Sequence, residues 1–197
     1  MIAAMITLIL GLALFLGIHS VRIVADGWRA RFIAARGPMT WKGLYSVIAI
    51  AGFVLICAGF GQALQQPVVL WSPPGWTHHV AAPLTLLAFL LVTAAYVPAN
   101  GIQSRVEEPM VLGVKCWALG HLLANGTLAD VVLFGSFLAW SVFDFRAAKQ
   151  RRRAGMAPTI AAPRATRTVA TLVVGVLAWT LFAFHLHRLL IGVQPLA

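Results

Sequence analysis

Charged residues are scarce in this sequence, and acidic residues are the scarcest of them. Only 10% of the 197 residues are charged, and Asp and Glu together number 5. Soluble domains carry roughly 25% charged residues, so this chain cannot cover a water-exposed surface. Hydrophobic residues make up 60% of the sequence and fall in long uninterrupted blocks. These features exclude a soluble domain and indicate an integral membrane protein.

Cysteines and nucleotide-binding motifs are nearly absent as well. The two cysteines, Cys57 and Cys116, stand alone inside apolar segments without a CxxC spacing, which excludes a disulfide framework and a cysteine metal site. We interpret both as small packing residues. No P-loop, Rossmann glycine pattern or Ser-His-Asp arrangement occurs in a suitable context. The first apolar segment is too long for a signal peptide and lacks a small-residue cleavage site, so we expect it to be retained.

Six apolar segments approach the length of a membrane-spanning helix, which is about 20 residues for a hydrocarbon core of roughly 30 Å. These segments are residues 2–25, 43–64, 80–99, 110–124, 128–145 and 169–191. The sequence therefore predicts an all-α fold, a polytopic transmembrane bundle of about six helices. We find no internal repeat, and we expect residues 1–197 to form a single integral membrane domain.

The basic residues predict how the chain is oriented. The first and fifth connections carry most of the Lys and Arg, Arg105 lies in the third, and the second, residues 65–79, has none. The positive-inside rule then places connections one, three and five in the cytoplasm and both termini outside. The short basic run 151–153 is tethered at the membrane. We interpret it as a topology determinant that contacts anionic lipid, not as a nucleic-acid site.

The fourth segment, residues 110–124, is unusually short and spans only about 22 Å as a helix. Pro109 precedes it and the turn signal Asn125-Gly126 follows it. We expect a tight hairpin of the fourth and fifth helices, with its tip buried in protein because lipid cannot satisfy a turn's backbone. Asn125 is placed to supply hydrogen bonds there. Asp130 is either a functional group beside this tip or an acidic first-turn residue.

Two histidines lie inside apolar segments, where polar groups are costly and are candidates for function. His19 lies about 9 Å from the cytoplasmic end of segment one, and His121 about 16 Å from the cytoplasmic start of segment four. The brevity of segment four brings these depths within several ångström, so the pair is placed to face one another across a cofactor. Neutral imidazole binds metals and accepts haem iron axially. The alternative is that each histidine only hydrogen-bonds a neighbouring helix.

Four further histidines lie near the side predicted to be outside. His78 and His79 precede segment three, where solvation is easy. His185 and His187 stand near the end of segment six, two residues apart, so they point in nearly opposite directions and at most one faces the bundle. The sequence does not determine their roles.

The remaining acidic residues have structural explanations. Glu107 and Glu108 lie at the start of segment four, where the helix dipole favours acidic groups, and a general acid or base role is the alternative. Asp144 is placed to pair with Arg146 or Lys149.

Several runs resemble the NnrU family of bacterial membrane proteins, which are associated with nitrite and nitric oxide respiration. These runs are GIHSVRI, YSVIAIAGFVLICAGFG, KCWALGHLLANGTLADVVLFGSFLAW and HRLLIGVQPL, which extend over essentially the whole chain. The resemblance implies a six-helix protein of the bacterial cytoplasmic (inner) membrane with a role linked to denitrification. The family's own biochemical activity is not well defined.

NnrU proteins are in turn similar to 15-cis-zeta-carotene isomerase, a membrane enzyme with haem b. Its proposed axial haem ligands match His19 and His121, so the resemblance implies haem b with these two ligands. Ala118 stands where the isomerase has a cysteine, and Glu107-Glu108-Pro109 replaces an Arg-His-Pro run that the family shares with isoprenylcysteine methyltransferases. Both departures argue against transferring carotene isomerisation or methyl transfer.

Three functions follow from these observations. The first is a haem b membrane protein that supports nitrogen-oxide respiration or sensing. The second is a haem-dependent isomerase or other enzyme that acts on an isoprenoid lipid. The third is a non-catalytic membrane assembly factor whose histidines only bind helices together. We expect contact with membrane lipid, possible binding of a hydrophobic small molecule and no nucleic-acid partner; the sequence determines neither a substrate nor an oligomeric state.

Overall fold

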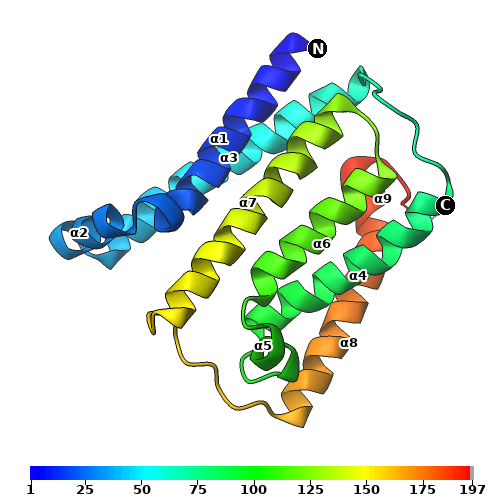
Figure 1. Cartoon of the computed structure of the whole chain (residues 1–197). Coiled ribbons are helices and arrows are strands. Elements are labelled where there is room, and N and C mark those ends of the chain that lie inside the picture. Colours follow the sequence, from blue (N-terminus) through cyan, green and yellow to red (C-terminus); the bar gives the residue numbers. More distant parts are fainter. Residues whose placement is uncertain (196–197) are drawn as a thin grey trace. The chain divides into compact units, whose positions relative to one another are not determined.

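The structure is a computed structural model of the chain that describes residues 1–195 (Figure 1). In chain order the elements are α1 (Ile2–Val24), α2 (Asp26–Arg36), α3 (Pro38–Gln65), α4 (Trp76–Tyr96), α5 (Gly101–Val106), α6 (Pro109–Ala124), α7 (Leu128–Arg153), α8 (Ala165–Leu181), the π-helical turn η1 (Phe182–Leu186) and α9 (His187–Ile191). The described residues form no β-strand, and one isolated bridge joins Val69 to Thr127. The predicted all-α class is confirmed.

Within residues 1–195, five helices are long and apolar enough to cross a membrane. They are α1, α3, α4, α7 and the continuous helix Ala165–Ile191, and between 17% and 28% of each apolar window is buried inside the protein. Most of each window therefore faces outward, as contact with lipid requires. The sixth segment is α6, which has 16 residues and a length of about 24 Å. The predicted polytopic helix bundle is thus confirmed, and α6 is short, as expected for the fourth segment.

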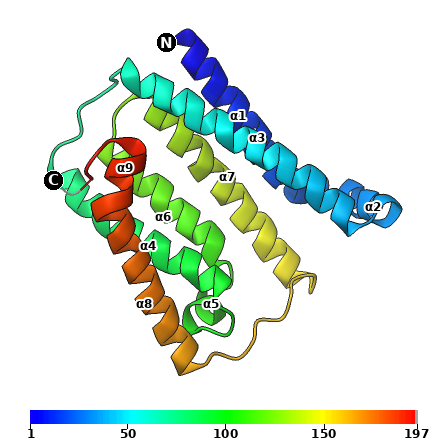
Figure 2. The ribbon, with the colours of Figure 1, turned by 180° about the vertical axis from the view of Figure 1, so that it is seen from behind.

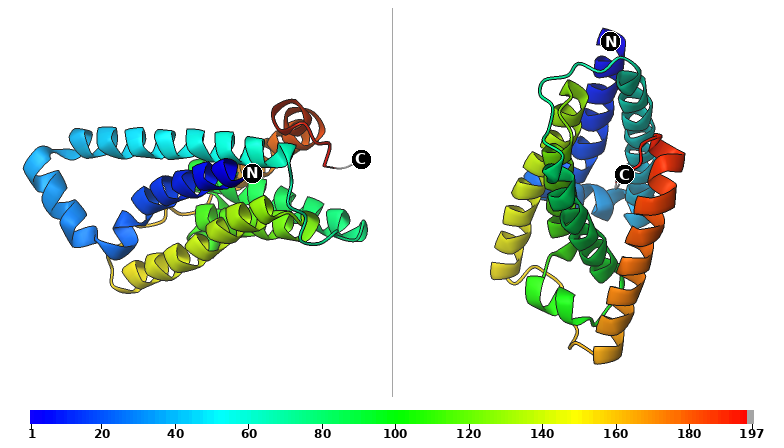
Figure 3. Two further views of the ribbon diagram at one scale, coloured as in Figure 1. Left: turned by 90° about the horizontal axis from the view of Figure 1, so that it is seen from above. Right: turned by 90° about the vertical axis from the view of Figure 1, so that its right-hand side faces the viewer.

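Several helices extend further than their apolar segments. α3 begins at Pro38, α4 begins at Trp76, and α7 continues to Arg153. Hydropathy marks only the part of a helix that is suited to hydrocarbon, whereas the α-helix itself continues into polar sequence. Between α1 and α3 the basic stretch forms its own helix, α2, which ends at Gly37 with φ of 84° (Figure 3, left). Glycine adopts that left-handed backbone without steric cost, and Pro38 then starts α3.

The chain divides into two compact units. Unit 1 comprises Met1–Leu70 and Thr127–Ser136, and unit 2 comprises Trp71–Gly126 and the chain from Phe137 onward. In unit 1, α1 and α3 pack side by side (Figures 1 and 2). A Cβ on Gly11 would lie 2.6 Å from the backbone nitrogen of Ile56, so the two backbones approach as closely as glycine allows. Small residues at such crossings drive helix association in membranes, because lipid offers no hydrophobic force between helices.

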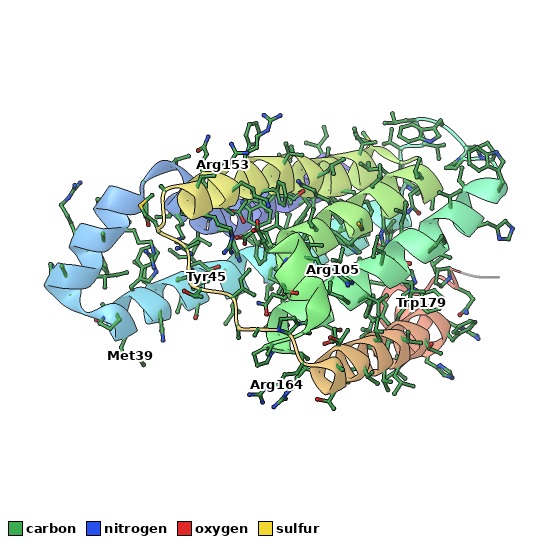
Figure 4. The ribbon with its side chains drawn as sticks, turned by 60° about the horizontal axis from the view of Figure 1, so that its bottom comes forward. Met39, Tyr45, Arg105, Arg153, Arg164 and Trp179 are labelled. Atoms are coloured by element: carbon green, nitrogen blue, oxygen red, sulfur yellow. The ribbon has the colours of Figure 1, made fainter. Side chains whose placement is uncertain are left out.

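In unit 2, α4 packs against both α6 and α8 (Figure 2). On α8, Gly175 faces the backbone of Leu90, and a Cβ there would come within 2.8 Å of that leucine's side chain. The indole Nε1 of Trp179 donates a hydrogen bond of 3.0 Å to Oγ1 of Thr85, which joins α8 to α4 (Trp179 is labelled in Figure 4). Close backbone approach and an interhelical hydrogen bond therefore hold this unit together.

Polar side chains organise both sides of the connection between α6 and α7. The side-chain amide of Asn125 donates a hydrogen bond of 2.9 Å to the carbonyl of His121, which confirms the role expected for Asn125. In unit 1, Thr127 and Asp130 form a capping box. The carboxylate of Asp130 accepts from the backbone nitrogen and hydroxyl of Thr127, and that hydroxyl accepts from the nitrogen of Asp130. Asp130 is 4% exposed, and this cap accounts for its burial without a catalytic role.

Candidate functional site

His19 lies in the last third of α1 and is half-buried within unit 1. Its Nδ1 donates a hydrogen bond of 2.6 Å to the carbonyl of Phe15, one turn earlier in the same helix. The ring of Phe15 stacks on the imidazole at a centroid distance of 4.2 Å, and the ring of Tyr45 approaches from α3 at 5.1 Å. The helix backbone and two aromatic rings therefore fix the orientation of His19.

His121 lies in the last turn of α6 and is half-buried within unit 2. Its Nδ1 donates a hydrogen bond of 2.8 Å to the carbonyl of Trp117, again one turn earlier. The Trp117 ring lies 5.3 Å from the imidazole, and the ring of Phe137 meets the Trp117 ring edge-on at 5.3 Å. The surroundings of His121 thus repeat those of His19. In each case the residue four positions earlier supplies both the carbonyl that accepts from Nδ1 and the aromatic ring beside the imidazole.

The shared Nδ1 bond determines what each imidazole can do. A carbonyl oxygen only accepts, so Nδ1 carries the proton, and in the neutral ring Nε2 is the basic nitrogen. This is the tautomer in which histidine binds a metal through Nε2, and a carbonyl on Nδ1 is a common means of orienting such a ligand. Among residues 1–195 there is no group of three or more His, Cys, Asp or Glu that could hold a metal ion.

A pocket of about 370 Å³ opens beside His19 inside unit 1. Besides His19 it is lined by three cations, Arg22, Arg29 and Lys42, together with Trp41, Tyr45 and other residues of α1 and α3 (Tyr45 is labelled in Figure 4). Trp41 is 7% exposed, and its ring meets the rings of Trp28 and Phe32 from α2. The pocket is strongly basic.

Sequence patterns did not indicate Lys115, which lies in α6. Its ammonium nitrogen stands 3.9 Å from the centroid of the Phe145 ring, a cation–π contact within unit 2. A lone lysine inside an otherwise apolar run is the signal that would have marked it. Sequence patterns also did not indicate Trp41 and Tyr45 as residues that line a pocket, but for another reason. They gain their place through packing against α1 and α2, and nothing in the local pattern of α3 sets them apart.

Glu107 and Glu108 do more than complement a helix dipole. Within unit 2, the carboxylate of Glu107 accepts a hydrogen bond from Lys149, and that of Glu108 accepts one of 3.0 Å from Arg152. The Lys149 bond is the main reason that the pKa of Glu107 lies below its ordinary value. Glu107 also has a φ of 65°, and the backbone nitrogen of Glu108 donates to the carbonyl of Val106 across it. Such a tight turn at a non-glycine residue is strained, and the two ion pairs hold it in place.

The other candidates have local explanations. His78 and His79 are exposed, as expected. His185 is exposed, while His187 donates from Nδ1 to the carbonyl of Val193 at 2.7 Å and so fastens the chain that follows α9. The π-helical turn η1 changes the helical phase just before His187, which no sequence pattern indicated.

Asp144 lies 3.7 Å from Arg151, two turns further along α7, a partner that the sequence did not suggest. Cys57 and Cys116 are free thiols; Cys116 is half-buried, whereas Cys57 is exposed and so is not the buried packing residue that we expected.

Comparison with known proteins identifies the family. The family described as NnrU protein matches residues 7–195, so the chain belongs to the NnrU family and is a multi-pass integral membrane protein of that type. No curated protein and no solved structure matches the chain significantly.

Proposed function

We propose that this NnrU protein binds haem b in the bacterial cytoplasmic membrane, that His19 and His121 would hold its iron, and that the protein serves nitrite and nitric oxide respiration. Bound haem would supply reversible one-electron chemistry. The protein's contribution is to present imidazoles of fixed tautomer and orientation. The family supports the link to denitrification, and the histidine geometry supports the cofactor.

The observation that carries the proposal is the repeated local geometry of the two histidines. In both, Nδ1 donates to the carbonyl at i−4, at 2.6 Å for His19 and 2.8 Å for His121. Each bond lies within one helix, so each ring is oriented by its own unit. A ligand held in this way loses little rotamer freedom on binding, and its Nδ1 bond increases the basicity of Nε2. His187 also donates from Nδ1 to a carbonyl, but that carbonyl belongs to Val193, six residues further along the chain, so its ring is not oriented by the preceding helical turn.

The aromatic residues at i−4 suit the same cofactor. Phe15 stacks on His19 and Trp117 lies against His121, so each imidazole has a flat apolar neighbour. A porphyrin is large, flat and mostly apolar, and such sites are lined mainly by aromatic and aliphatic side chains. These aromatic neighbours support the proposal of a haem beside the two histidines.

The absorption spectrum of the purified chain tests the proposal. After haem-replete expression we expect a Soret band with the sharp visible bands of six-coordinate, low-spin iron. His19→Ala and His121→Ala should each abolish this low-spin signature and decrease haem content. The matched control is His79→Ala, which removes an exposed histidine and should leave the spectrum unchanged.

Absence of a Soret band from haem-replete wild type would overturn the proposal. A low-spin spectrum that survives His121→Ala would overturn the assignment of that ligand. If haem is absent and His121→Asn retains both function and stability, the non-catalytic assembly factor becomes the better description. The orientation is tested separately by reporter fusions, since both termini should report from the outer side.

A further inference from the structure

The basic pocket of unit 1 contains three cations that a histidine ligand does not need. It lies where α1 ends and α3 begins, and three cations line its wall: Arg22, Arg29 and Lys42. Arg29 is held on the wall by an ion pair of 3.2 Å with Asp26 and by the Trp41 ring, 5.9 Å from its guanidinium carbon. Among the described residues, Arg22 and Lys42 have no carboxylate within ion-pair distance, so the pocket carries a net positive charge.

We propose that this pocket binds the phosphate of an anionic phospholipid. Arg22 and Lys42 would neutralise the phosphate from the ends of α1 and α3, with Arg29 completing the positive wall. Ser46 also lines the pocket, and its hydroxyl can donate to a phosphate or to a headgroup hydroxyl. Arginine matches phosphate geometry through its planar fork, while lysine acts as a mobile point charge.

The size of the pocket favours a headgroup over a bare inorganic anion. A water molecule occupies roughly 30 Å³ of liquid, so a volume of about 370 Å³ holds a group of on the order of ten non-hydrogen atoms. A phosphate esterified to glycerol has about that size. A small inorganic anion would leave most of the pocket to water.

The surroundings of the pocket favour a lipid over a soluble phosphate ester. α1 and α3 both have apolar windows suited to hydrocarbon, and they leave large side chains such as Leu14, Val47 and Ile50 more than 40% exposed. Acyl chains would lie against this surface while the headgroup enters the pocket at the end of α1. The first connection also lies on the side that the positive-inside rule assigns to the cytoplasm, where anionic lipids attract basic segments.

The simpler reading is that these cations only set the orientation of the chain. Arg22 lies in the last turn of α1, where a cation complements the helix dipole, and it also counts toward the positive-inside bias. That reading requires no pocket. It predicts that removal of any two basic residues of the first connection has the same effect on the affinity for anionic lipid. Arg31 and Arg36 on α2 are exposed and do not line the pocket, so they provide a matched pair for comparison.

The test measures thermal unfolding of the full chain in a neutral detergent during titration with phosphatidylglycerol, phosphatidylcholine or glycerol 3-phosphate. Phosphatidylglycerol should raise the Tm of wild type and phosphatidylcholine should not, because a ligand stabilises the state to which it binds. The double variant Arg22→Gln/Lys42→Gln should bind phosphatidylglycerol roughly 30-fold more weakly, which corresponds to about 1 kcal/mol per cation. Arg31→Gln/Arg36→Gln removes the same charge and should retain wild-type affinity.

Three results would overturn the inference. Equal losses in the two double variants would show a diffuse charge effect. Glycerol 3-phosphate as effective as the lipid would show that the occupant is a soluble phosphate ester. Loss of haem in Arg22→Gln/Lys42→Gln with unchanged lipid affinity would show that the pocket serves haem carboxylates instead. If the double variant does not accumulate, Lys42→Gln alone gives the same comparison with Arg36→Gln, since both side chains are exposed.

Discussion

Replacement of Gly11 by alanine tests whether close contact between α1 and α3 holds unit 1 together. A Cβ at this position would lie 2.6 Å from the backbone nitrogen of Ile56 and 2.9 Å from the carbonyl oxygen of Gly52. Both neighbours are backbone atoms of a helix, so neither can rotate away as a flexible side chain would. The added methyl group must therefore push the two helices apart by roughly an ångström to reach ordinary contact.

The size of the effect follows from two opposing contributions. Overpacking of a tight contact costs typically about 1–3 kcal/mol. Alanine is a better helix former than glycine by about 1 kcal/mol in a helix interior, which offsets part of that cost. A Cβ added to Gly17 on the same helix would meet no atom within 4 Å, so Gly17→Ala gains the propensity without the clash. The two variants should differ by about 1–3 kcal/mol in the free energy of unfolding.

The measurement is the unfolding temperature of both variants and wild type in the same detergent. One kcal/mol shifts the Tm of a chain of this size by about 2–4 °C, so Gly11→Ala should unfold several degrees below Gly17→Ala. Separation of α1 from α3 should also widen the basic pocket and weaken its selectivity for phosphatidylglycerol. Equal unfolding temperatures for the two alanine variants would refute the claim that this crossing is a tight, stabilising contact.

Two further predictions concern polar groups at helix ends. The pKa of Glu107 is lowered mainly by the hydrogen bond from Lys149, so its carboxylate stabilises the fold above its ordinary pKa of 4.5 and loses that contribution as the pH falls through the lowered value. The Tm of wild type should therefore fall more steeply below pH 4.5 than that of Glu107→Gln, and parallel pH profiles would contradict this. Thr127→Ala removes the capping box and should lower the unfolding free energy by about 1 kcal/mol, while Thr127→Ser should retain it. Thr166→Ala, at an exposed threonine in the first turn of α8, is the control, and an equal effect there would count against the cap.

Local signals in the sequence predicted most of the fold. Long apolar runs mark hydrocarbon-spanning helices because lipid enforces both their length and their composition. The end of α6 was also predictable, since Asn125-Gly126 is a turn signal and Asn125 carries the amide that bonds the His121 carbonyl. The cap formed by Thr127 and Asp130 is local in the same way, because its two partners lie within one helical turn of each other.

Features that depend on packing were not predictable in the same way. Gly11 and Gly52 are two of many small residues in apolar runs, and only the crossing of α1 and α3 shows that their backbones meet. The basic pocket likewise combines Arg22 with Lys42, which the intervening helix α2 brings to one wall. The pairs of Glu107 with Lys149 and of Glu108 with Arg152 join residues far apart in sequence. Such contacts follow from tertiary structure, which no local pattern encodes.

The end of α6 also bears on why a histidine stands at position 121. The carbonyl of His121 accepts from both the backbone nitrogen and the side-chain amide of Asn125, each at 2.9 Å. These bonds use the backbone of residue 121, so a leucine there would end the helix equally well. An imidazole inside an apolar helix carries a desolvation cost that leucine avoids. The helix end therefore does not require the histidine, so the role of its side chain is decided by the spectra of His121→Ala and not by the structure of this turn.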